Sequence, residues 1–131
     1  MTKQKFNFLK IAEFCTREAE EKKADNVISL NVSEVTTIAD YFILCTAQSE
    51  PQMKALANWL QKRVFEEFKL KPTTVDGESA SKWILIDFGA VLIHIMTPEM
   101  RDRYQLETLW GDAPKLEDFQ KLEKITAGKS N

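Results

Sequence analysis

Residues 83–110 read WILIDFGAVLIHIMTPEMRDRYQLETLW, and the rest of the predicted fold builds on them. Residues 83–87 and 91–96 are rich in branched and aromatic side chains, which favour pleated strands. Phe88 and Gly89 lie between these two runs, and glycine readily takes the positive φ that a tight turn needs. We therefore predict a β-hairpin with Phe88-Gly89 as its loop, in which Trp83 faces His94 across the two strands.

The two faces of this hairpin differ in chemistry. One face is wholly aliphatic and carries Ile84, Ile86, Val91, Ile93 and Ile95. The other face is mixed and carries Trp83, Leu85, Asp87, Leu92, His94 and Met96. An aliphatic face is suited to the protein's own core, whereas a face with Trp, His and a carboxylate is a candidate for contact with a partner. A slip of one residue in the pairing would exchange the two faces.

The composition limits the class of protein. A chain of 131 residues suffices for one domain with a core, and 44% hydrophobic with 29% charged residues is typical of soluble proteins. No run approaches the roughly 20 apolar residues of a membrane helix, and the N-terminus shows no signal-peptide pattern. A net charge of −2 argues against a broad nucleic-acid surface. Cys15 and Cys45 lie in apolar surroundings, which indicates free thiols in a reducing compartment, so we expect a cytoplasmic protein.

The rest of the chain supplies helices and further strands. Apolar residues at helical spacing predict a helix that starts near Phe8 and closes at Asp25-Asn26. Residues 27–32 predict a short strand, residues 41–47 a central strand covered on both faces, and residues 73–75 an edge strand. Ser49 is a candidate N-cap for a second helix that ends near Leu70. The predicted fold class is therefore an α/β (α+β) sandwich, with a mixed sheet of about five strands and helices packed on it.

The domain boundary follows from composition. Residues 1–113 predict a single domain, and Pro114 follows Gly111 at its end. Residues 114–131 predict a marginal helix and then a flexible tail.

Few residues are candidates for catalysis or metal binding. His94 is the only histidine, and Cys45 is the one attractive nucleophile that could pair with it. The alternative is a packed or partner-facing histidine and an inert core thiol. One histidine and two separated cysteines cannot supply the four ligands of a zinc site. Asp76 and Glu78 could hold a magnesium ion, although such a pair is also what a solvated turn contains.

An aromatic and charged cluster follows the hairpin. Thr97 can cap a helix with Pro98 in its first turn, and on that helix Arg101 and Tyr104 would share a face, with Glu107 three residues further on. Trp, Tyr and Arg dominate binding hot spots, since they combine apolar area with a polar or charged end. Leu106 and Leu109 fit a covering for one edge of the sheet, whereas Tyr104 and Trp110 fit either role.

Three ordered motifs give the chain a recognisable pattern: TIADYF from Thr37 to Phe42, then Gly77 followed by WILIDFG and a strand containing His94, then R-x-x-Y-x-L-E-x-L-W. In this order they resemble the ribosomal silencing factor family, also called the Iojap-like family, over about residues 8–113. The last motif is formed by Arg101, Tyr104, Leu106, Glu107, Leu109 and Trp110.

The resemblance implies a fold like the nucleotidyltransferase superfold without its catalytic motif. It also implies binding to ribosomal protein fourteen of the large subunit, which would block joining of the small subunit and repress translation. The residues agree with a protein that is not an enzyme and has no cofactor, because the chain lacks a Gly-Ser turn followed by an Asp-x-Asp metal pair. Ribosomal proteins are basic, so carboxylates could pair with them. The expected partner-binding residues are Trp83, Asp87, His94, Arg101, Tyr104, Glu107 and Trp110.

Two alternatives remain open from the sequence. The first is a nucleotide- or phosphate-handling enzyme that uses Asp76, Glu78 and His94. The second is a dimerisation module, in which the mixed face of the hairpin pairs with a second copy of the chain. A ribosome-binding chain could likewise form a homodimer when it is off the ribosome.

Overall fold

Three helices and a five-stranded mixed sheet make up the fold in the computed structural model, which describes residues 6–77 and 82–106. The elements follow the chain in the order α1 (Phe8–Glu21), β1 (Asp25–Asn31), β2 (Tyr41–Thr46), α2 (Glu50–Phe68), β3 (Thr74–Asp76), β4 (Trp83–Asp87), β5 (Val91–Met96) and α3 (Pro98–Tyr104). The strands lie in the order β1-β2-β5-β4-β3, and only β2 and β5 run parallel. The predicted fold class is confirmed, whereas the boundary predicted at residue 113 and the tail after it lie outside the described residues.

Both long helices begin where the sequence supplies a cap. The Asn7 side chain accepts a hydrogen bond from the Lys10 amide at the start of α1, and Ser49 accepts one from the Gln52 amide at the start of α2. Such side chains satisfy amides that have no partner within the helix. The left-handed residue Lys69 (φ 56°) ends α2 one residue after Phe68, close to the predicted end.

The start of β1 differs from the prediction. Asp25 and Asn26 were expected to close the first helix as turn residues, but they open the strand instead. The helix already ends at Glu21, and Lys23, two residues later, adopts a left-handed φ of 66°. Asn26 is also left-handed (φ 51°), and the pairing with β2 shifts between Asp25 and Ile28. The two polar residues therefore form a β-bulge at the strand's start rather than a separate turn.

The β4–β5 hairpin exists, but the predicted loop is displaced by one residue and the predicted pairing by two. Asp87 pairs with Leu92 and Trp83 with Met96, while the Phe88 amide donates to the Val91 carbonyl at 2.9 Å. The loop is thus Gly89-Ala90, with Gly89 at φ +93°. Phe88 extends the ladder because its side chain is buried in the core. A shift of two residues preserves the side-chain alternation, so the aliphatic and mixed faces are as predicted.

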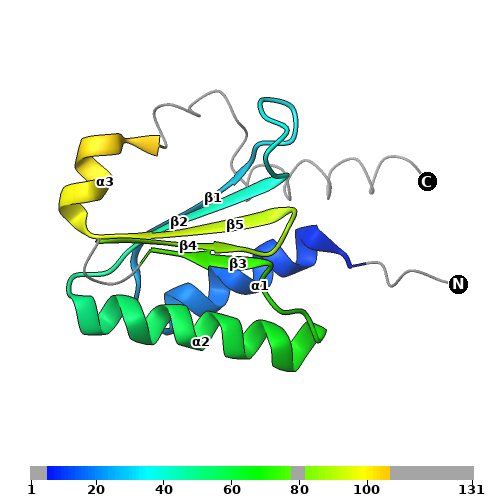
Figure 1. Cartoon of the computed structure of the whole chain (residues 1–131), viewed down its shortest axis with the longest axis horizontal. Helices are drawn as coiled ribbons and strands as arrows, with labels where there is room; N and C mark the ends of the chain where they lie inside the picture. The colour runs from blue at the N-terminus through cyan, green and yellow to red at the C-terminus, as the bar shows by residue number, and fades with distance from the viewer. Residues whose placement is uncertain (1–5, 78–81, 107–131) are drawn as a thin grey trace, which may run out of the picture.

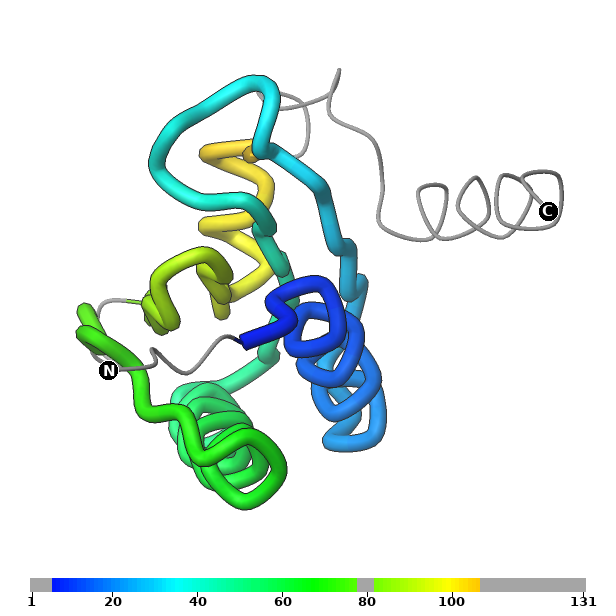
Figure 2. The backbone as a smooth tube through the Cα atoms, turned by 90° about the vertical axis from the view of Figure 1, so that its right-hand side faces the viewer, coloured from blue at the N-terminus to red at the C-terminus, as the bar shows by residue number. Residues whose placement is uncertain are grey.

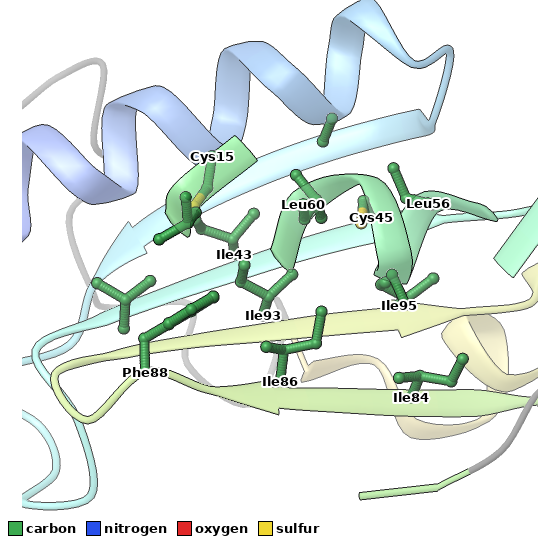
Figure 3. Packing of buried hydrophobic residues seen from close by; sticks show 14 of the residues in the cluster. Cys15, Ile43, Cys45, Leu56, Leu60, Ile84, Ile86, Phe88, Ile93 and Ile95 are labelled. Carbon is green, nitrogen blue, oxygen red and sulfur yellow. The ribbon is translucent and has the colours of Figure 1, made fainter. Parts of the chain in front are cut away.

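The helices divide between the two faces of the sheet. Helices α1 and α2 lie on one side and α3 lies on the other (Figures 1 and 2). The main core fills the space between the sheet and helices α1 and α2, where aliphatic side chains of β2, β4 and β5 meet Leu56 and Leu60 of α2 (Figure 3). A smaller cluster on the opposite face contains Leu30, Phe42, Leu44 and Leu92. The central strand β2 is therefore covered on both faces, as its unbroken apolar run predicts.

No helix in the described part of the chain has the length and apolar character needed to cross a membrane.

Candidate interaction site

An aromatic cluster lies at the end of the sheet where α3 begins. Trp83 of β4 and His94 of β5 are diagonal neighbours on the mixed face, because Trp83 pairs with Met96 and His94 with Leu85. The Trp83 indole Nε1 donates to His94 Nδ1 at 3.2 Å. The ring of Tyr104, at the end of α3, lies 5.1 Å from the Trp83 ring, centroid to centroid. A hairpin and a helix thus hold three of the predicted site residues together.

His94 is a neutral, buried member of this cluster. Only 7% of the residue is exposed, and the Phe42 ring packs edge-on against it at 5.1 Å. Burial, aided by the nearby Arg101 charge, lowers the pKa of His94 to about 4. Since Nδ1 accepts from Trp83, the proton of the neutral ring is on Nε2. Among the described residues, that Nε2 has no hydrogen-bond partner. His94 is therefore shielded from solvent, and its hydrogen bond orients the Trp83 ring.

Arg101 and Tyr104 have different roles although they belong to one short helix. Arg101 is only 6% exposed, and its Nη1 donates to the Thr46 hydroxyl at the end of β2 at 2.8 Å. This bond anchors α3 to the sheet. Tyr104 is 48% exposed, and its ring packs at a tilt of 53° against the Trp83 ring. Of these two residues, Tyr104 is the one that a partner could reach.

Asp87 lies away from the aromatic cluster. It sits at the hairpin end of β4, four residues from Trp83, which is about 13 Å along a strand. Its carboxylate accepts a hydrogen bond from the Gly89 amide at 2.7 Å and so fixes the turn. Glu107 and Trp110 lie outside the described residues, and the helix itself ends at Tyr104, where Gln105 is left-handed (φ 43°).

The residues proposed for catalysis do not come together. Cys45 and His94 place their side chains on opposite faces of the sheet, because Leu44 is the register partner of His94. The thiol faces the core, and burial raises the pKa of Cys45 to about 12, which makes it a poor nucleophile. Asp76 pairs with Leu85, so it is two strands, or about 10 Å, from His94. Glu78 lies outside the described residues. Within residues 6–77 and 82–106, no three His, Cys, Asp or Glu residues could share a metal ion.

Two residues of the cluster were not predicted from the sequence. Phe42 supports His94, and Thr46 holds Arg101. Thr46 gives a weak signal, since it is the one threonine or serine in a mostly apolar strand. Its partner is 55 residues away, so no local pattern connects the two.

Fold and site together define a small α+β domain with an aromatic cluster on one end of a mixed sheet. Residues 5–131 match the family model RsfS, ribosomal silencing factor during starvation, and the chain belongs to this family. A protein called ribosomal silencing factor RsfS from Halalkalibacterium halodurans is 36% identical over 107 residues, which cover 82% of this chain and 91% of that protein. The predicted family resemblance is thereby confirmed.

Further relatives include a protein named for mitochondria and a bacterial protein of known crystal structure. A mouse protein called mitochondrial assembly of ribosomal large subunit protein 1 is 29% identical over 69% of this chain and 40% of its own length. A crystal structure of a protein from Chromobacterium violaceum has a TM-score of 0.76 and 32% identity, covering 81% of this chain and 88% of that one. The arrangement of sheet and helices is therefore also that of an experimentally solved relative.

Proposed function

We propose that this chain silences ribosomes by binding the large subunit at its protein fourteen and blocking attachment of the small subunit. The observation that carries the proposal is the family match, which spans residues 5–131. In this proposal the protein acts in the cytoplasm, without a cofactor and without catalysing a reaction. Inhibition is steric, because a bound domain occupies the volume that the small subunit needs.

The aromatic cluster is suited to anchor such a complex. Tyr104 is 48% exposed and its ring packs against Trp83, which is itself held by the hydrogen bond to His94. A side chain that is already ordered loses little conformational entropy on binding, and Tyr and Trp recur at the energetic centres of interfaces. A stable complex would bury roughly 1,600 Å² in total, which a domain of this size can supply.

Carboxylates would assist the approach to a basic partner. Asp76 is exposed on β3, and Asp87 is partly exposed at the hairpin turn. Charge pairs at the margin of an interface raise the association rate and fix the orientation more than they raise affinity. Added salt should therefore slow association of the chain with the large subunit.

Co-sedimentation with isolated large subunits tests the proposal. The wild-type chain should pellet with large subunits, and Tyr104→Ala should weaken this binding by about 2 kcal/mol if Tyr104 is a hot spot. Phe65→Ala is the matched control, because Phe65 is an aromatic residue of similar exposure (43%) on α2, across the sheet. Equal binding by Tyr104→Ala and wild type would remove Tyr104 from the interface, and absence of binding by the wild type would overturn the function.

A further inference from the structure

A second feature lies at the same end of the sheet, on the side of β2. The parallel strands β2 and β5 both end at this edge, at Thr46 and Met96. The chain then leaves in opposite directions, since α2 follows β2 onto one face and α3 follows β5 onto the other (Figure 1). In open α/β sheets such divergence at the carboxyl ends of neighbouring strands creates a crevice that binds ligands.

A cavity of about 520 Å³ occupies this crevice. This volume is within the range of small-molecule sites in proteins. The residues around it are mostly polar and include Asp25, Thr46, Gln48, Arg101, Asp102 and Gln105. They come from β1, the end of β2 and α3, so the cavity is built between elements that are far apart in the sequence.

Charges of both signs line the cavity at different depths. Arg101 and Thr46 are buried and joined by their hydrogen bond, so they form the floor and place a permanent positive charge there. Asp25 and Asp102 are exposed and form the mouth. The Gln48 side-chain Nε2 donates to Asp25 Oδ2 at 2.7 Å and fixes that carboxylate in position.

This separation of charge selects a class of ligand. A phosphate or a nucleotide would bring several negative charges past the carboxylates of Asp25 and Asp102. A polyamine would bring positive charge toward Arg101. A molecule with a carboxylate at one end and an ammonium a few bonds away could satisfy both, because guanidinium and carboxylate pair strongly when partly desolvated.

We propose that the cavity between β1, β2 and α3 binds a small zwitterion, a free amino acid, with its carboxylate toward Arg101 and its ammonium toward Asp102 and Asp25. The spare volume accommodates a polar side chain beside Gln48 and Gln105. This binding site is distinct from the Trp83–Tyr104 surface and does not depend on the proposed ribosome binding.

The test uses the full-length chain and defined probes. Each of the twenty free amino acids is titrated by thermal shift, and the best is measured by calorimetry, since a ligand of the folded state raises the melting temperature by mass action. We expect at least one amino acid to give a saturable shift. Its N-acetyl derivative lacks the ammonium and its amide lacks the carboxylate, so both should lose this shift, and inorganic phosphate should produce none.

Matched variants locate the site. Asp102→Asn should raise the dissociation constant about tenfold, as expected when a charge-assisted hydrogen bond is lost. Glu99→Gln removes the same charge from the same helix, but Glu99 lies outside the cavity, where it pairs with Lys82 at 3.6 Å, so this variant should bind like wild type. The proposal is overturned if no amino acid binds, if the blocked derivatives or phosphate bind equally well, or if both variants behave alike.

Discussion

The Trp83–His94 hydrogen bond joins two side chains that sequence patterns treat separately. It requires a neutral His94 with Nδ1 as acceptor, which agrees with a buried ring whose pKa falls to about 4. This bond gives the exposed Tyr104 a fixed support through the Trp83 ring. At the residue scale, the site is therefore an assembly of one exposed ring and two supporting ones.

Replacing Trp83 with Phe should lower the free energy of unfolding by about 1 kcal/mol or more, because His94 Nδ1 would stay buried without its donor. Urea unfolding followed by circular dichroism measures this change. The double variant Trp83→Phe/His94→Phe should cost less than the sum of the two single variants, because it removes both partners. Additive effects would show that the bond contributes no net stability.

The stability of the fold should depend on pH through His94. Its pKa of about 4 in the folded state lies below the ordinary histidine value of 6.5, so the unfolded chain binds the proton more readily. His94 thus contributes stability at neutral pH that is lost as pH falls from about 6.5 toward 4. Between pH 7 and 5 the wild type should lose about 2 kcal/mol more than His94→Phe, which has no such proton to bind. Parallel pH profiles of the two proteins would contradict this assignment.

At the scale of elements, helices α1 and α2 are joined by a polar network above the core. Glu18 of α1 accepts hydrogen bonds from Trp59 Nε1 at 3.1 Å and from Arg63 Nε at 3.3 Å, both on α2. Arg63 also lies over the Trp59 and Phe14 rings. Trp59 of α2 therefore helps to join the two helices. The sequence alone does not reveal this role.

Glu18→Gln should destabilise the protein by about 1 kcal/mol, because Glu18 is largely shielded and receives two hydrogen bonds. Glu67→Gln is the control: Glu67 also pairs with Arg63, but it is 52% exposed and 3.7 Å away, so its loss should cost less than about 0.5 kcal/mol. Thermal or urea unfolding compares the two variants. Equal losses would mean that the network is no more than a set of surface charges.

The sequence predicts the elements well where their signals are local. Ser49 and Thr97 cap helices as expected, and the alternation of Ile84 and Ile86 assigns the buried face of the hairpin correctly. The predicted hairpin loop was wrong. Phe88 precedes a turn glycine, but burial of its side chain in the core keeps it in the strand pairing and out of the loop. The Arg101–Thr46 bond was likewise beyond prediction, since it joins residues 55 positions apart.

At the scale of the whole molecule, the helices on the two faces of the sheet have different roles. Helices α1 and α2 cover the aliphatic face and stabilise the sheet, whereas α3 leaves on the other face and carries both Tyr104 and the wall of the charged cavity. The proposed binding surfaces therefore share one end of the sheet, and the main core lies behind them. Since the family match covers almost the entire chain, the proposed silencing belongs to this domain as a whole.

In the proposed function, the chain acts by occupying the surface of the large subunit that the small subunit joins. This claim is tested most directly by mixing purified subunits after the large subunit has been incubated with the chain, and by measuring the joined fraction on a sucrose gradient. We predict that joining falls in proportion to the large subunits occupied, and that Phe65→Ala blocks joining as wild type does while Tyr104→Ala requires a higher concentration. Undiminished joining by large subunits that carry the bound chain would contradict the claim.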